Sequence, residues 1–121
     1  MPSKSVQEFE ALSLEEKVYV ASSSIHGKGC FAKVDVPKGA YIGTYEGPKA
    51  KRDSKFTLWV MAPEKPIGRV GRNALKYLNH SDTPNAEFSE FDLYASTAIP
   101  AGAEITFDYD PDGENEGDWW E

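Results

Sequence analysis

Two short motifs contain residue types that could bind a ligand or support a reaction. The first is the turn Gly27-Lys28-Gly29, where the missing side chains of two glycines would let a ligand approach the backbone closely. It is not a dinucleotide-binding fingerprint, because neither a third glycine nor a βαβ unit follows it. The alternative interpretation is that both glycines only form a tight reversal of the chain.

The second motif, Asn79-His80-Ser81, directly follows an apolar segment and ends at Thr83-Pro84-Asn85. A run of polar and turn residues at such a place usually forms a surface loop. No acid and serine nearby have the chain order or the turn context of a hydrolase triad. Neither motif therefore identifies a reaction by itself.

Metal and disulfide chemistry have few candidate residues. Cys30 is the single cysteine, which excludes an internal disulfide and any zinc site built on several cysteines. His26 and His80 are the two histidines. We therefore expect no metal centre.

The charges are distributed unevenly along the 121 residues, whose net charge is −7. All 13 lysines and arginines lie at or before Lys76, and only acidic charges follow it. The acidic C-terminal segment is either a solvated tail that aids solubility or a negative surface that attracts a basic peptide. Direct binding of nucleic acid is disfavoured, because phosphate binding needs a basic face.

The sequence contains no apolar run near the roughly 20 residues of a membrane span. No apolar signal segment follows Met1. We therefore expect no membrane partner and no secretion, and an intracellular location that is cytoplasmic or nuclear, the nucleus of a host included.

Short strands separated by glycine and proline turns are expected to position the two motifs within one domain. Capping-box spacing at residues 13–16 predicts a helical turn, and residues 73–78 form the best helix candidate of the second half. Residues 63–71 are predicted to be a loop. Strands are predicted at residues 18–22, 30–34, 41–45, 56–61 and 104–109, with a hairpin over residues 86–98. The class is therefore β-rich, although the pattern does not determine the topology.

Four segments occur in a specific order at compact spacing. They are Ser24-Ile25-His26-Gly27-Lys28-Gly29-Cys30-Phe31-Ala32, then residues 37–47 with Tyr45-Glu46-Gly47, then residues 73–81 with Asn79-His80-Ser81, and finally residues 99–109 with Phe107-Asp108-Tyr109. Together they resemble the SET domain family over residues 22–110, about three-quarters of the chain.

The resemblance implies a mostly β fold of several short sheets with a C-terminal pseudoknot, an exception to the usual absence of threading. The implied organisation is a SET domain over residues 18–110, preceded by an appendage of residues 1–17. An acidic aromatic tail follows over residues 111–121.

The resemblance also implies a protein-lysine N-methyltransferase that uses S-adenosylmethionine and releases S-adenosylhomocysteine. The backbone around His26, Gly27, Lys28 and Gly29 would hold the methionine part of the cofactor. Asn79 and His80 would bind its amino group and adenine. The family pattern assigns catalysis to Tyr45 and Tyr109, and a lysine channel to these two with Phe88 and Phe107.

The implied chemistry explains the aromatic residues. Free lysine has a pKa of about 10.4, so the amine must lose a proton before it can attack a methyl group. An aromatic channel favours the neutral amine by desolvation and aligns it for in-line displacement. The Tyr109 hydroxyl could hold the polarised methyl through weak C–H···O contacts. No metal is required.

Phe107 bears on the degree of methylation. In the family, phenylalanine two residues before the catalytic tyrosine leaves room for two or three methyl groups, and Phe88 is a second such position. We therefore predict dimethyl- or trimethyl-lysine as the product. The alternative is that both are only core aromatics.

Several positions depart from the common family pattern. Lys76 replaces an arginine and Asp82 replaces a cysteine, and the zinc-binding segment that follows many SET domains is absent. Trp119, expected at the cofactor, and Trp120 are candidates to close the site in its place. They could instead form a dimer contact. The insert between Gly47 and Asn73 is short, and in the family this insert helps to recognise substrate peptides.

A basic protein or peptide, such as a histone-like tail, is the expected partner, which would place the function in chromatin. A homodimer remains an open alternative. Two other functions also remain open: a catalytically inert SET-derived binding module, and a cofactor-free ligand-binding domain of the β-clip type.

Overall fold

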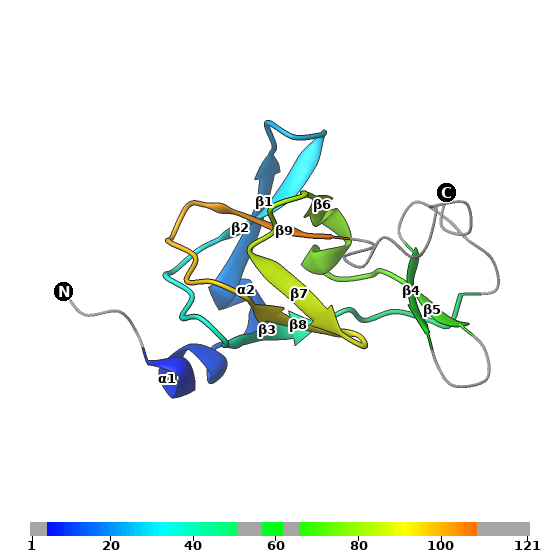
Figure 1. Ribbon diagram of the computed structural model, residues 1–121, viewed down its shortest axis with the longest axis horizontal. Coiled ribbons are helices and arrows are strands. Elements are labelled where there is room, and N and C mark those ends of the chain that lie inside the picture. The colour runs from blue at the N-terminus through cyan, green and yellow to red at the C-terminus, as the bar shows by residue number, and fades with distance from the viewer. Residues whose placement is uncertain (1–4, 51–56, 62–65, 109–121) are drawn as a thin grey trace.

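The computed structural model describes residues 5–50, 57–61 and 66–108 (Figure 1). In this part of the chain, short strands form three small sheets and the helices are short. The β-rich class is therefore confirmed. None of the described helices is long and apolar enough to cross a membrane.

Two short helices precede the sheets: α1 (Val6–Glu10) and α2 (Leu14–Lys17). A serine caps each of them with a complete capping box. At α2, the Ser13 Oγ accepts from the Glu16 N–H at 3.3 Å and the Glu16 carboxylate accepts from the Ser13 N–H at 2.9 Å. These reciprocal bonds satisfy donors that the helix itself leaves unpaired, and they confirm the predicted helical turn.

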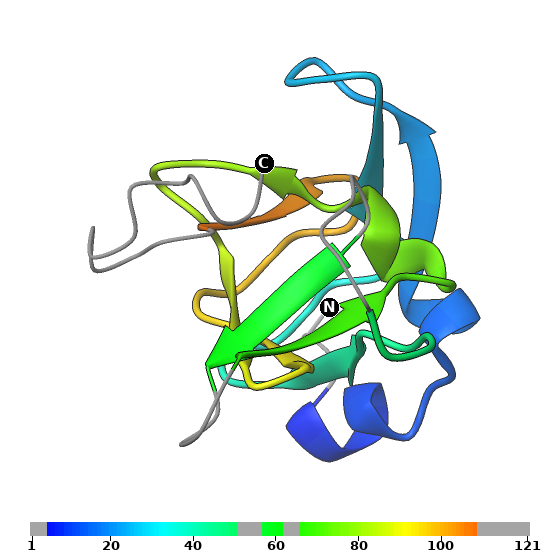
Figure 2. The same cartoon turned by 90° about the vertical axis from the view of Figure 1, so that its right-hand side faces the viewer.

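The four-stranded sheet contains both chemical motifs. Its order is β1 (Val18–Ser22), β2 (Lys28–Ala32), β9 (Glu104–Phe107) and β6 (Asn79–His80). The β1–β2 and β2–β9 pairs are antiparallel, whereas β6 and β9 run parallel. The late strand β9 therefore lies between an early strand and the Asn-His segment. Figure 2 shows the β1–β2 hairpin projecting from one end of the molecule.

The three-stranded sheet has the order β3 (Tyr41–Thr44), β8 (Asp92–Ala95) and β7 (Ala86–Ser89). The β7–β8 pair confirms the predicted hairpin within residues 86–98. The 3-10 helix η1 (Ala74–Tyr77) contacts β1 and β2 and is a single turn at the position of the helix candidate.

The third sheet corrects one prediction. The loop predicted at residues 63–71 is wrong for residues 66–70, because β5 (Pro66–Val70) pairs antiparallel with β4 (Thr57–Met61) over its whole length. Residues 63–65 lie outside the described residues. Proline is tolerated as the first residue of an edge strand. Gly68 is needed because a Cβ there would lie 2.8 Å from the Trp59 ring. The residues that suggested a loop are therefore compatible with a strand.

One apolar core joins these elements. Its fully buried side chains include Ile42, Leu75, Leu93 and Ile105, which come from β3, η1, β8 and β9. Phe9 of α1 is also fully buried in it. The N-terminal helices thus share the core with the sheets, and the boundary at residue 17 stays a prediction.

Candidate active site

The Gly-Lys-Gly turn and the Asn-His-Ser motif meet through the side chain of Asn79. Its Nδ2 group donates to the backbone carbonyls of His26 at 3.2 Å and Lys28 at 3.1 Å. It also donates to the Glu104 carboxylate at 2.8 Å. These hydrogen bonds join the Gly-Lys-Gly turn to the Asn-His-Ser motif, about fifty residues further along the chain, beside β9.

Glu104 connects the same turn to the strand β9. The Ser23 hydroxyl donates to the two carboxylate oxygens, at 2.7 Å and 2.9 Å. The Ser23 Oγ in turn accepts from the Ile25 N–H at 2.9 Å and lies 3.4 Å from the His26 nitrogen. Gly29 is buried against the Glu104 carboxylate, and any Cβ at this position would overlap it. A side chain at the second glycine of the turn would therefore have to displace the Glu104 carboxylate.

Gly27 and Lys28 lie on the exposed side of the turn. Gly27 has a φ of 44°, which disfavours other residues, and no atom lies within 4 Å of the place its Cβ would take. The Lys28 ammonium lies 5.9 Å from the centre of the Tyr77 ring. This face of the turn is open, with a cation at its edge.

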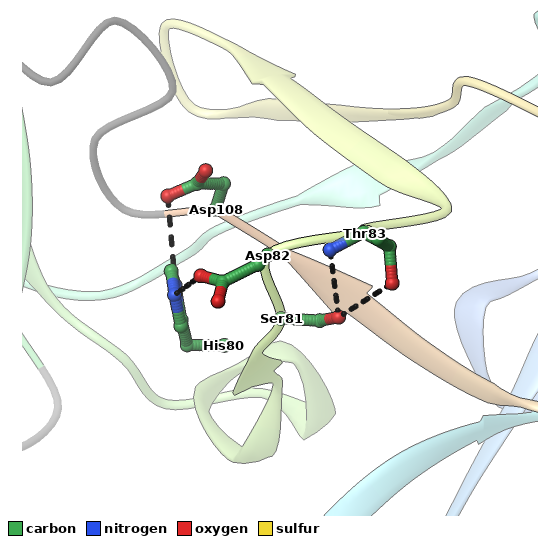
Figure 3. Close-up of polar contacts among 5 residues, drawn as sticks. All are labelled: His80, Ser81, Asp82, Thr83 and Asp108. Atoms are coloured by element: carbon green, nitrogen blue, oxygen red, sulfur yellow. Dashed lines mark hydrogen bonds and ion pairs between the residues drawn. The ribbon is translucent and has the colours of Figure 1, made fainter.

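His80 places its ring next to two carboxylates, those of Asp82 and Asp108 (Figure 3). Its Nε2 lies 3.1 Å from Asp82 and its Nδ1 lies 3.6 Å from Asp108. The backbone beside it is fixed to β9, because the Ser81 N–H donates to the Phe107 carbonyl at 3.0 Å. The imidazole thus contacts acidic side chains, and the backbone that follows it is bonded to β9.

Asn85 fixes β9 from a second point. Its Nδ2 donates to the Glu104 carbonyl at 2.8 Å, and its Oδ1 accepts from the Thr106 N–H at 2.9 Å. The carboxamide thus pairs with the strand as a neighbouring peptide group would. The segment of residues 79–85 is therefore bonded to β9 at both of its ends, by the backbone of β6 and by the Asn85 side chain.

The predicted channel residues form a cluster of aromatic rings at the end of β9. The rings of Tyr45 and Phe88 meet edge-on with centroids 6.0 Å apart, and Phe88 and Phe107 meet edge-on at 5.2 Å. Edge-to-face packing at these distances is favourable. Tyr45 and Phe107 are buried, and Gly71 leaves room for the Tyr45 hydroxyl.

A groove of about 300 Å³ adjoins these rings. Strand β4 contributes Trp59 to it, and β7 contributes Phe88. Three of its lining residues are acidic, Glu87, Glu90 and Asp108. The groove thus combines apolar walls with a negative charge.

Cys30 is not a nucleophile candidate, although it lies in β2 beside β9. Its side chain is fully buried. Burial, with a smaller contribution from the Glu104 charge, raises the pKa of the Cys30 thiol to about 12. Because the thiolate is the reactive form, this thiol is inert at neutral pH.

Most of the predicted site residues lie either around Asn79 or in the cluster of aromatic rings. His26, Gly27, Lys28 and Gly29 lie with Asn79, and Tyr45 lies with Phe88 and Phe107. Tyr109, Trp119 and Trp120 lie outside the described residues. Sequence reasoning missed the roles of Glu104, Ser23 and Asn85. Glu104 lies within the quoted motif of residues 99–109, so the motif could have identified it as a site residue. Ser23 lies in none of the quoted motifs.

The strand order and the paired motifs define the class to which the protein belongs. The chain belongs to the SET domain family, whose model matches residues 27–110. Among curated proteins, it is 28% identical over 129 residues to the histone-lysine N-methyltransferase MEDEA of Arabidopsis thaliana, covering 89% of this chain and 19% of that protein. It is 30% identical over 124 residues to the human histone-lysine N-methyltransferase 2D, covering 84% of this chain and 2% of that protein. The chain thus spans only a small part of the length of these relatives.

Proposed function

We propose that this protein is a protein-lysine N-methyltransferase that uses S-adenosylmethionine. The observation that carries the proposal is the arrangement along β9. Glu104 at one end of the strand contacts the turn and Asn79, and Phe107 at the other end packs in the ring cluster with Phe88. The family and the names of its relatives support the same activity.

Asn79 and the turn of residues 26–29 fit the polar end of the cofactor. The Asn79 amide N–H groups point to three oxygens of the protein, while no hydrogen bond from a described residue reaches its Oδ1. That oxygen is suited to accept from a ligand ammonium group. The exposed Lys28 ammonium is suited to a carboxylate, and the backbone of residues 26–29 and 80 would contact the remainder. When bound, S-adenosylmethionine supplies an electrophilic methyl group on a sulfonium.

The ring cluster fits the acceptor lysine. Tyr45, Phe88 and Phe107 offer an apolar surrounding, which disfavours an ammonium ion and therefore lowers the pKa of an inserted lysine. The rings also restrict the amine to few orientations, which raises the chance of in-line attack. We assign Tyr45 and Tyr109 as the catalytic pair, with Tyr109 assigned from the family pattern.

The acidic groove supports a basic peptide as the substrate. Its carboxylates would attract lysine or arginine near the target, and its aromatic side chains would cover the aliphatic parts of the peptide. The relatives are named as histone-lysine methyltransferases. We therefore propose a histone-like tail as the substrate class, and dimethyl- or trimethyl-lysine as the product because both Phe88 and Phe107 lack a hydroxyl.

The proposal is tested by transfer of radiolabel from S-adenosylmethionine into core histones and other basic proteins. We expect label in at least one of them and a strong loss with Tyr109→Phe. Thermal unfolding separates the other outcomes, because a ligand at 100 times its Kd stabilises a protein by about 2.7 kcal/mol. Stabilisation without transfer would indicate an inert binding module, and neither effect would indicate a cofactor-free domain.

A further inference from the structure

We infer that Glu104 is a positioning residue that sets the orientation of the Asn79 carboxamide and, through it, selects the amino group of the cofactor. The inference rests on the proposed function for the identity of the ligand. It goes beyond that function by assigning a role to a side chain that touches neither the proposed lysine channel nor the acidic groove.

The orientation of Asn79 follows from its three acceptors. The carbonyls of His26 and Lys28 and the Glu104 carboxylate all face the Nδ2 group, at 3.2, 3.1 and 2.8 Å. A flipped carboxamide would direct its Oδ1 at three oxygens. The Glu104 bond is the shortest and the one that involves a charge, and bonds to charged groups are the stronger ones. Glu104 therefore makes the largest contribution to keeping Oδ1 on the ligand side.

Two donors converge on the Glu104 carboxylate, and both of them reach its Oε2 atom. The Ser23 hydroxyl and the Asn79 Nδ2 group both donate to Glu104. An ionised carboxylate has two accepting oxygens and serves both donors at once. A glutamine keeps one accepting oxygen, which is neutral, and replaces the other oxygen by an NH₂ donor that would face either Asn79 or Ser23.

The side-chain amide of the Glu104→Gln variant could take two orientations, and each would disturb a hydrogen bond of the site. If the new NH₂ group faced Asn79, the Asn79 carboxamide would be driven to flip. If it faced Ser23, it would compete for the Ser23 Oγ, which already accepts from the Ile25 N–H at 2.9 Å. Glu104→Gln should therefore disturb the orientation of Asn79 or the turn of residues 23–27, with almost no change in side-chain volume.

The test uses calorimetric binding of two probes to the full chain: S-adenosylhomocysteine, and its analogue in which hydrogen replaces the α-amino group. In the wild type, we expect the analogue to bind roughly tenfold more weakly, as for the loss of one charge-assisted hydrogen bond. In Glu104→Gln, this ratio should fall, because the Asn79 carboxamide is either flipped or held by a neutral oxygen, which binds it less strongly than a carboxylate does. A general loosening of the site would weaken both probes equally and leave the ratio unchanged.

Glu15→Gln is the matched control, since Glu15 is an exposed carboxylate on α2, and its ratio should equal that of the wild type. Ser23→Ala provides a second test that keeps Glu104, and its ratio should fall by less than in Glu104→Gln. An unchanged ratio in Glu104→Gln would overturn the inference; if that variant does not fold, an unchanged ratio in Ser23→Ala overturns it instead. Failure of the wild type to bind S-adenosylhomocysteine would overturn the proposed function itself.

Discussion

Phe107 packs edge-on against Phe88, which packs in the same manner against Tyr45. These residues were predicted as one group from the family motifs, and the structure brings them together. The hydrogen bond between Ser23 and Glu104 was not predicted, because it joins residues 81 positions apart and depends on the pairing of β2 with β9. Motifs thus predict which residues gather, but not the polar side chains that orient them.

Phe107→Tyr should restrict the product to monomethyl-lysine. The added hydroxyl, with any water bound to it, would take the space beside the amine that further methyl groups need. Mass spectra of a methylated peptide under excess cofactor report the outcome directly. Wild-type products that stop at one methyl group would contradict our interpretation of Phe107, and Phe91→Tyr serves as an aromatic control outside the ring cluster.

Gly71→Ala should displace the Tyr45 hydroxyl. A Cβ at this position would lie 2.6 Å from the Tyr45 Oη and 2.7 Å from the Lys76 Cβ. Overpacking of this kind costs about 1–3 kcal/mol, and we expect both the free energy of unfolding and the methylation rate to fall. Adding Tyr45→Phe removes the overlap with the hydroxyl but leaves the ring carbon Cζ at 2.8 Å, so it should restore only part of the stability, without restoring activity. Urea denaturation that finds no recovery in the double variant would argue against this contact.

At the scale of the elements, local signals predicted helix starts and strands but not pairings. The capping box at Ser13 was correct because it depends on neighbouring residues. Strand β5 was missed because Pro66 and Gly68 resemble loop residues, and their compatibility with a strand depends on the edge position and on Trp59. The parallel β6–β9 pair was not predicted, since nothing in the hydrophobic pattern specifies it.

The last residue of α2 yields an element-scale prediction. Lys17 is buried, and its ammonium donates to the carbonyls of Ile42 at 3.0 Å and Tyr41 at 3.3 Å. It also lies about 5 Å from the ring centres of Phe9 and Tyr41. These contacts join the N-terminal helices to β3. Burial lowers the pKa of Lys17, and the nearby Glu10 opposes the shift only in part.

The lowered pKa of Lys17 determines the direction in which the free energy of unfolding changes with pH. The unfolded chain has the ordinary lysine pKa of about 10.4 at residue 17, whereas the folded chain has a lower pKa there. As the pH rises toward 10.4, the folded chain therefore loses this proton before the unfolded chain does. Stability from this group therefore rises as the pH increases toward that value. Lys17→Met lacks this effect, so the excess stability of the wild type over the variant should grow with pH in urea denaturation. A difference that is constant or shrinks over this range would contradict the interpretation.

At the scale of the molecule, the charge asymmetry seen in the sequence has a counterpart in the groove. Glu87, Glu90 and Asp108 all belong to the part of the chain that follows Lys76, where no lysine or arginine occurs. The sequence could not show which of the acidic residues share a surface, because the β7–β8 hairpin and the end of β9 bring them to one groove. Charge complementarity of this kind affects encounter and specificity more than the chemical step.

Replacing both Glu87 and Glu90 by glutamine should raise the KM for a basic peptide while leaving kcat and the Kd of S-adenosylhomocysteine unchanged. Exposed charge pairs contribute about 0.2–1 kcal/mol each, so the expected rise in KM is roughly several-fold. The difference between variant and wild type should shrink at high salt. Steady-state kinetics with a peptide series of decreasing charge measures this, and a KM that is insensitive to both charges would exclude the groove as the peptide site.

The central claim is that the protein transfers a methyl group from S-adenosylmethionine to a lysine side chain. It is tested most directly by mass spectrometric mapping of core histones and other basic proteins after incubation with the enzyme, in the presence and absence of S-adenosylmethionine. We predict methyl groups on lysine ε-nitrogens that require the cofactor and are lost with Tyr109→Phe. Methyl groups on other residues only, or no methyl groups on any protein although S-adenosylmethionine binds, would contradict it.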